Sequence, residues 1–296
     1  MRFWCVPLLV ITALPGVCQR SDWNLRDHIP LDQVIVQSHR GAGELMPENS
    51  LEAFELGWRV GTIPEADLRT TRDGIIVAFH DENFRHILPS ASPEMQKRGI
   101  KDLDWAEVSA LDIGAWKGTR FAGQRVASLS AVSEVLRKNP RRRLYIDIKN
   151  VDLEQLARES RAAGVAARLI LASTDYTVIR TWKKLAPESS TIHWMGGPEE
   201  VLAQRIADLR KTNFADIDQL QIHVRESGGT MRPSAEFLLK TGAELRSYRI
   251  LFQTLPFGSK DPALFRRLMD LGCASFATDY PDVMMNTIRE YYAARH

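Results

Sequence analysis

A sustained alternation of strand-like and helix-like segments from residue 34 onward constrains the fold most. Short apolar runs rich in β-branched residues predict strands, and apolar residues at every third or fourth position predict helices. The expected strands span residues 34–38, 63–68, 75–79, 144–148, 169–172, 191–194, 219–224, 249–252 and 274–277. The expected helices span residues 51–60, 131–138, 153–163, 176–185, 199–211, 234–241, 262–271 and 283–294.

These segments make eight strand–helix units and one extra strand. Repeated β/α units indicate parallel strands, and eight of them favour a (β/α)8 TIM barrel over an open doubly wound sheet. No GxGxxG pattern follows the first strand, which argues against a dinucleotide-binding fold. The Asp73-Gly74 turn signal predicts that residues 75–79 pair antiparallel with the strand before them.

Residues 82–126 interrupt the alternation with several glycines and prolines and one expected short helix near residues 105–111. We expect this stretch to be a small insertion after the second strand, lying over the mouth of the barrel. The sequence thus predicts an α/β protein with one barrel domain over residues 31–296.

The N-terminus has the pattern of a secretory leader. A positive start at Arg2 precedes an apolar stretch over residues 6–17, which is shorter than the ~20 residues that span a bilayer. We expect residues 1–20 to be a signal peptide and the protein to be exported, periplasmic or secreted, with no integral membrane segment after leader removal. A lipid anchor through Cys18 is disfavoured, because Val17 is large for the residue that precedes a lipidated cysteine.

Composition narrows the class of partner. The formal net charge of +2 is too small to argue for nucleic acid, and 44% hydrophobic with 26% charged residues is ordinary for a globular protein. Once the leader is removed, Cys273 is the one cysteine inside the fold. This excludes a disulfide framework and a cysteine-ligated metal site, and we expect Cys273 to be a buried apolar residue.

Polar side chains gather at the expected strand ends, where barrels of this kind place their chemistry. The first three expected strands bring His39 and Arg40, then Glu65 and Asp67, then His80; the next brings Asp147 and Lys149. The later strands end near Ser173, Trp194, His223, Gln253 and Asp279. In a barrel with only a structural role, the desolvation of so many charges would cost free energy without a compensating function.

Three carboxylates in this set suit a hard cation. Glu65 and Asp67 are two residues apart, so their side chains project to the same side of a strand. With Asp147 they offer oxygen ligands for Ca²⁺ or Mg²⁺, and the lack of thiolates argues against structural zinc.

The remaining charged side chains suit a phosphate ester. Arg40 and Lys149 can balance phosphate charge, Arg40 with a bidentate grip. His39 and His80 can move protons near neutral pH. A metal, two cations and a histidine pair together suit displacement at phosphorus.

Several short motifs occur here in an order and spacing that resemble the glycerophosphodiester phosphodiesterases. They are His39-Arg40-Gly41, Pro47-Glu48-Asn49-Ser50, Ala53-Phe54, Glu65-Ala66-Asp67, Thr71-Arg72-Asp73-Gly74, His80-Asp81, the segment 144–149 and Thr278-Asp279-Tyr280-Pro281. The resemblance covers residues 34 to 285 and implies a (β/α)8 barrel with a small insertion after the second strand.

The resemblance also implies an activity, the metal-dependent hydrolysis of small-molecule glycerophosphodiesters to sn-glycerol 3-phosphate and an alcohol. It implies that the glycerol 2-hydroxyl attacks phosphorus and that water then opens the cyclic phosphate. The implied roles are general base and acid for His39 and His80, metal binding for Glu65, Asp67 and Asp147, phosphate binding for Arg40 and Lys149, and a place near the metal or the glycerol for Glu48.

Two departures from the family pattern leave alternatives open. The family usually has glutamate where this chain has Asp147, and a Trp-Thr pair on the seventh strand where this chain has Phe252-Gln253-Thr254. One alternative is a barrel phospholipase that cyclises intact lipids. The other is a catalytically weak barrel that binds phosphorylated ligands.

Several other polar or aromatic residues have ordinary structural interpretations. We expect Asn49, Ser130 and Asp279 to cap the helices that follow them. We expect His86 and His193 to be structural or exposed. Trp105 and Trp116 either pack the insertion or gate the ligand.

Overall fold

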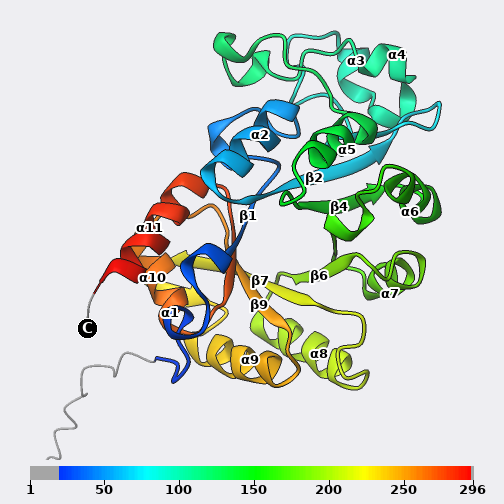
Figure 1. Ribbon diagram of the computed structural model, residues 1–296. Coiled ribbons are helices and arrows are strands. Elements are labelled where there is room, and N and C mark those ends of the chain that lie inside the picture. The colour runs from blue at the N-terminus through cyan, green and yellow to red at the C-terminus, as the bar shows by residue number, and fades with distance from the viewer. Residues whose placement is uncertain (1–19, 295–296) are drawn as a thin grey trace, which may run out of the picture.

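The computed structural model describes residues 20–294, so the predicted leader and Cys18 lie outside the described residues, apart from residue 20. Eight parallel strands close into a barrel with helices around it (Figure 1). The order around the barrel is β1-β10-β9-β7-β6-β5-β4-β2, and β2 pairs back with β1. The predicted (β/α)8 barrel is therefore confirmed.

The barrel strands match the predicted ones closely. They are β1 (Ile35–Ser38), β2 (Ile63–Thr70), β4 (Leu144–Asn150), β5 (Leu169–Ser173), β6 (Ser190–Met195), β7 (Gln219–Ser227), β9 (Leu251–Pro256) and β10 (Ser275–Thr278). The helices between and after them are α2 (Leu51–Val60), α5 (Leu129–Lys138), α6 (Leu153–Ala162), α7 (Tyr176–Leu185), α8 (Glu199–Arg210), α9 (Ala235–Ser247), α10 (Pro262–Asp270) and α11 (Pro281–Ala293). A short helix before the barrel, α1 (Leu25–His28), is tied to α11 by the Tyr292 hydroxyl, which donates to the Ile29 carbonyl at 2.6 Å.

The hairpin after the second strand also forms as expected. β3 (Ile76–Ala78) pairs antiparallel with β2, with Leu68 opposite Ala78 and Thr70 opposite Ile76. Residues 82–126 then leave the barrel and return at α5.

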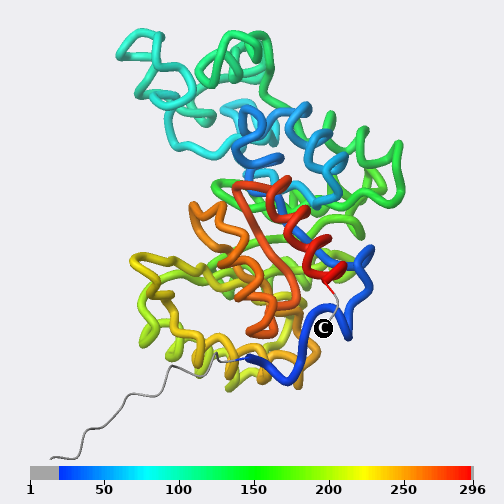
Figure 2. Tube along the Cα trace, turned by 90° about the vertical axis from the view of Figure 1, so that its left-hand side faces the viewer, coloured from blue at the N-terminus to red at the C-terminus, as the bar shows by residue number. Residues whose placement is uncertain are grey.

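This insertion holds the short helices α3 (Pro93–Lys97) and α4 (Trp105–Val108) and forms a lobe at one side of the barrel (Figures 1 and 2). The lobe has an apolar core of its own, which includes Phe84, Ile100 and Val108, and both Trp105 and Trp116 pack against that core. An ion pair between Lys117 and Glu44, at 3.1 Å, joins it to the loop between β1 and α2.

The structure corrects two predicted caps. Ser50 caps α2 by accepting a hydrogen bond from the Ala53 amide at 3.1 Å, whereas Asn49 has φ 58° and serves another partner. Ser128, rather than Ser130, caps α5. In each case a serine preceding the first helical turn has the extended backbone that a capping residue needs.

Two strands differ from expectation. The seventh barrel strand, β9, runs four residues beyond its predicted end, so Gln253 lies inside the barrel rather than at the rim. A short strand that the sequence reading missed, β8 (Thr230–Arg232), pairs antiparallel with the end of β7.

The barrel interior is apolar on one side and hydrogen-bonded on the other. Tyr145 packs with inward-facing side chains of β5 and β6, and its hydroxyl donates to Gln219 at 2.7 Å. Gln253 donates to the Ser275 hydroxyl at 2.9 Å and accepts from Gln221. These bonds satisfy polar groups that would otherwise be costly to bury.

Most of the apolar core lies between the barrel and its helices. It includes Cys273, which is fully buried and free, in agreement with the sequence reading. Within residues 20–294, none of the helices has the length and apolar character needed to cross a membrane.

Candidate active site

Three carboxylates meet inside the barrel near the carboxyl ends of two neighbouring strands. β2 and β4 are paired in parallel, with Asp67 directly opposite Asp147, and Glu65 lies two residues before Asp67 on the same side. One oxygen of each carboxylate lies within 4.8 Å of the others. All three side chains are buried, so the structure brings together the predicted metal ligands Glu65, Asp67 and Asp147.

Lys149 lies between two of these acids. Its Nζ is 2.8 Å from Asp147 Oδ2 and 3.1 Å from Asp67 Oδ1. Asp67 Oδ1 is nevertheless buried without a hydrogen bond, because the contact with Lys149 does not have hydrogen-bonding geometry. The single ammonium group of Lys149 does not neutralise all three carboxylates, so the group can accept a further cation.

Burial and neighbouring charges shift the pKa values of the three carboxyl groups. Burial raises the pKa of Glu65 to about 7, with the charges of Asp67 and Asp147 acting in the same direction. Burial raises the pKa of Asp147 as well. Burial alone would raise the pKa of Asp67, but Lys149 and other nearby positive charges, with a hydrogen bond from Asn49, lower it. Crowded carboxylate oxygens of this kind fit a divalent cation.

Asn49 holds one of the three acids in place. Its Nδ2 donates to Asp67 Oδ2 and its Oδ1 accepts from the Asp67 amide, both at 2.9 Å. The left-handed backbone at Asn49, φ 58°, is one that asparagine adopts more readily than most residues. The sequence reading assigned Asn49 to a helix cap, so this role was missed.

His39 at the end of β1 is held by an aspartate from the opposite end of the sequence. His39 Nδ1 lies 2.6 Å from Asp279 Oδ1, and His39 Nε2 lies 3.9 Å from Glu65. Burial alone would lower the pKa of His39, but the hydrogen bond to Asp279 and the charge of Glu65 raise it to about 9.

Asp279 therefore belongs to the site, and the predicted helix cap is wrong. Tyr280 occupies the capping position of α11 and makes no side-chain cap bond. Thr278-Asp279 was visible as a motif, but nothing local in the sequence pairs Asp279 with a residue 240 positions earlier.

His80 has a matching arrangement. Its Nδ1 lies 2.7 Å from Asp81 Oδ1, and its Nε2 lies 3.0 Å from Arg40 Nη2. Arg40 Nη1 also donates to both carboxylate oxygens of Glu48, at 2.9 and 3.1 Å. Because the Arg40 guanidinium donates to Nε2, the proton of the neutral His80 ring lies on Nδ1 and is donated to Asp81.

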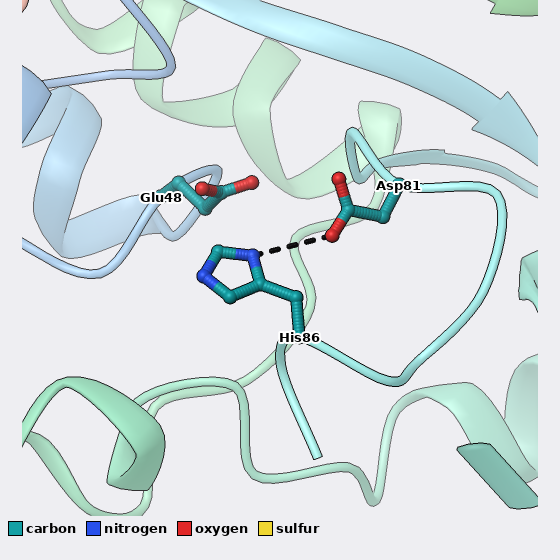
Figure 3. Close-up of side chains that lie close together, drawn as sticks. All are labelled: Glu48, Asp81 and His86. Carbon is teal, nitrogen blue, oxygen red and sulfur yellow. Dashed lines mark hydrogen bonds and ion pairs between the residues drawn. The ribbon is translucent and has the colours of Figure 1, made fainter. Parts of the chain in front are cut away.

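Glu48 lies apart from the three-carboxylate group. Figure 3 shows it reaching from the loop before α2 toward Asp81 and His86, with which it forms a second group of candidate ligand atoms. Both acids have partners, since Glu48 binds Arg40 and Asp81 binds His80. His86, which is exposed as expected, lies 3.2 Å from Asp81. This group acts as a charge network that orients Arg40 and His80.

The later strands contribute different side chains. Trp194 on β6 and His223 on β7 face inward near the rim, and their rings stack. His193 points outward instead, with Nδ1 3.1 Å from the Ser173 carbonyl. Burial and the neighbouring Arg205 lower the pKa of His193 to about 4, which suits a structural histidine.

Comparison with known proteins agrees with this geometry. The family model for the glycerophosphoryl diester phosphodiesterase family matches residues 39–283. A glycerophosphodiester phosphodiesterase of Caldanaerobacter subterraneus is 28% identical over 52% of this chain and 64% of its own length. A Bacillus subtilis protein of the same name is 22% identical over 88% of both chains. The chain thus spans just under two thirds of the first of these relatives.

Solved structures share the fold. A glycerophosphodiester phosphodiesterase from Agrobacterium tumefaciens superposes with a TM-score of 0.66 at 23% identity, covering 86% of this chain and 99% of that one. An Oleispira antarctica phosphodiesterase in complex with the product sn-glycerol-3-phosphate gives 0.64 at 24% identity, covering 86% and 96%. Because the family model spans most of its length, this chain belongs to the glycerophosphoryl diester phosphodiesterase family.

Proposed function

We propose that this protein is a metal-dependent enzyme that hydrolyses glycerophosphodiesters to sn-glycerol 3-phosphate and an alcohol. The observation that carries the proposal is the buried group of Glu65, Asp67 and Asp147 with His39 beside it and His80 across Arg40. The sn-glycerol 3-phosphate bound to the Oleispira antarctica relative supports the same product here.

The three carboxylates would hold a divalent cation, which would supply positive charge against the negative charge that develops on the phosphoryl oxygens. We propose Ca²⁺ or Mg²⁺, because the ligand atoms are all carboxylate oxygens. Asp147 is one methylene shorter than the usual family glutamate, so the choice of ion is the property most open to change at this site.

Arg40 and Lys149 would bind the phosphate oxygens. Contacts of Nη1 with Glu48 and of Nη2 with His80 fix the plane of the Arg40 guanidinium, and its Nε is buried without a hydrogen-bond partner. Lys149 is a point charge anchored by Asp67 and Asp147.

The two histidines would move protons on either side of the phosphorus. His39 would take the proton of the glycerol 2-hydroxyl as base, and His80 would give one to the leaving alcohol as acid. The acid role requires that Nε2 of His80 carry a proton and that Arg40 Nη2 contact the phosphate in place of this nitrogen. A cation beside Glu65 offsets the carboxylate charge that raises the pKa of His39, and so favours the neutral ring that a base requires.

We also propose that the protein is exported and that residues 31–296 form its catalytic unit, with residues 82–126 as the insertion. The leader-like composition of residues 1–20 supports export. Sequencing the N-terminus of protein recovered outside the cytoplasm tests it, and an intact Met1 there would contradict it.

The catalytic assignment is tested by turnover of glycerophosphocholine, with glycerol 3-phosphate measured by a coupled enzyme. His39→Ala and His80→Ala should each lower kcat by about 10²–10⁴-fold. His28→Ala is the matched control, because His28 is exposed and lies on α1, which precedes the first barrel strand. Wild-type turnover in His39→Ala would overturn the assigned role.

Phosphorus NMR of the products separates the phospholipase alternative, because a phospholipase that cyclises intact lipids releases no sn-glycerol 3-phosphate. An enzyme that acts on intact lipids needs an exposed apolar surface around its mouth. Of the large apolar side chains exposed in the described part of the chain, Phe257 follows a barrel strand and the others are scattered. We therefore expect water-soluble diesters to be cleaved and phosphatidylcholine vesicles to be left intact.

A further inference from the structure

The rim of the barrel has two chemically different halves. β1, β2 and β4 carry the charged groups described above, whereas β6, β7 and the residue after β9 carry Trp194, His223 and Phe257. The Trp194 and His223 rings lie nearly parallel, at 4° with centroids 5.3 Å apart. The Phe257 ring follows at 6.1 Å from His223. We call these three side chains the aromatic wall.

The aromatic wall adjoins the charged half. The amide of Gly258, next to Phe257, donates to the Asp279 carboxylate that holds His39. The Phe257 amide itself donates to the Val224 carbonyl at 2.9 Å, next to His223. One carboxylate thus separates the start of the aromatic wall from His39.

The central ring of the aromatic wall, His223, is held by side chains inside the barrel. His223 Nε2 lies 3.2 Å from Gln221 Oε1, and Gln221 donates in turn to Gln253 inside the barrel. On its other side the ring lies against Gly196, where an added Cβ would come within 3.0 Å of Nδ1. Burial and the charges of His39 and Arg225 lower the pKa of His223 to about 4, so the ring is uncharged near neutral pH.

The wall is open to a ligand. Phe257 is 42% exposed, and both Trp194 and His223 are partly exposed, although aromatic rings at a strand end gain more from burial. Aromatic surface at the mouth of this barrel is therefore left in contact with solvent.

The charges around the wall disfavour a cationic ligand. The Arg225 guanidinium lies 4.1 Å from the centroid of Phe257 and already provides a cation for that ring. The charged groups that act on His223 are His39, Arg225 and Asp279, and the carboxylate among them is hydrogen-bonded to His39 and Gly258. A quaternary ammonium would meet Arg225 without a free carboxylate to balance it.

A phosphodiester carries two alcohol arms on one phosphorus. If the phosphate and the glycerol 2-hydroxyl occupy the charged half, as the proposed function requires, the second arm extends across the rim. Resting on that function, we propose that the aromatic wall binds this leaving alcohol and selects an uncharged ring alcohol, a cyclitol or a sugar, whose C–H groups contact the exposed surface of Trp194 and Phe257.

The test compares glycerophosphoinositol with glycerophosphoethanolamine, which has a small cationic alcohol. We expect wild-type kcat/KM to favour the inositol diester. Phe257→Ala and Trp194→Ala should lower kcat/KM for it by about tenfold and for the ethanolamine diester by less than about twofold. Tyr248→Ala, an exposed aromatic residue after α9, is the matched control. Phe257 is exposed, so its truncation leaves the fold intact.

Equal losses on both diesters, or a wild-type preference for the ethanolamine diester, would overturn the inference. Titration of glycerophosphoinositol into His39→Ala, followed by the indole N–H signals in NMR, gives a readout independent of turnover. A shifted Trp194 signal supports the aromatic wall even if no diester is hydrolysed, which would overturn the proposed function alone. An unshifted Trp194 signal overturns the wall assignment.

Discussion

At the scale of single residues, the site pairs each imidazole with an aspartate. Asp279 binds His39 Nδ1 and Asp81 binds His80 Nδ1, so both Nε2 atoms face the other charged groups. An aspartate at Nδ1 fixes the ring orientation, and at His39 it also raises the pKa. The sequence did not predict the contact between Asp279 and His39. That contact gives the most specific prediction for a single residue.

In metal-stripped protein, Asp279→Asn should lower the pKa of His39 well below its value of about 9. Burial, which lowers this pKa, would remain, whereas the ionic hydrogen bond would be lost. Titration of the ring nitrogens by NMR measures the change. In the metal-loaded enzyme we expect kcat to fall by about 10- to 100-fold, less than for loss of the imidazole itself.

The same shift predicts a pH dependence of stability. Because the folded state raises the pKa of His39 from 6.5 to about 9, its contribution is complete below pH 6.5 and is lost as pH rises through 9. The difference in unfolding free energy between metal-stripped wild type and Asp279→Asn should therefore narrow over that window. Urea melts at several pH values measure it, and a constant difference would contradict the assignment.

At the scale of elements, α2 is the helix on which the site most depends. The loop before it carries Arg40, Glu48 and Asn49, and the helix lies so close that a Cβ at Gly57 would come within 2.4 Å of the Gly41 carbonyl. The start of α2 is fixed by Ser50, whose hydroxyl donates to the Pro47 carbonyl at 3.0 Å and accepts from Ala53.

Ser50→Ala should lower the unfolding free energy by about 1 kcal/mol and also lower turnover, because loss of the cap loosens the segment that carries Asn49. Ser128→Ala is the matched control, since Ser128 caps α5 in the same way. We expect it to cost a similar unfolding free energy and to leave kcat unchanged. Urea melts and initial rates measure both; equal effects on kcat would contradict this role for α2.

The periodicity of the chain predicted the barrel because each strand and helix has its own local pattern. The motifs predicted Glu65, Asp67 and Asp147 because spacing along paired strands decides which side chains share a face. The roles of Asn49 and Asp279 could not be predicted, since both residues sit where a cap is plausible and their partners lie elsewhere in the chain. Gln253 was misplaced because the end of a buried strand has no local signal.

At the scale of the whole molecule, closure of the barrel creates the site. β1 pairs with β10 at one edge and with β2 at the other, so the first and last barrel strands bring His39 and Asp279 together. The same closure places the aromatic wall beside the charged residues of the rim, with Asp279 between Gly258 and His39. The insertion is tied to this rim through Lys117 and Glu44.

The most direct test of the account is a phosphorus NMR time course of a glycerophosphodiester with metal-stripped protein, followed by addition of Mg²⁺ or Ca²⁺. We predict no sn-glycerol 3-phosphate signal before the addition and steady growth of that signal after it. Asp67→Asn protein should stay silent in both phases, because it lacks the carboxylate that Asn49 and Lys149 hold. Product release that is equally fast before and after the addition, or no release with either ion, would contradict the account.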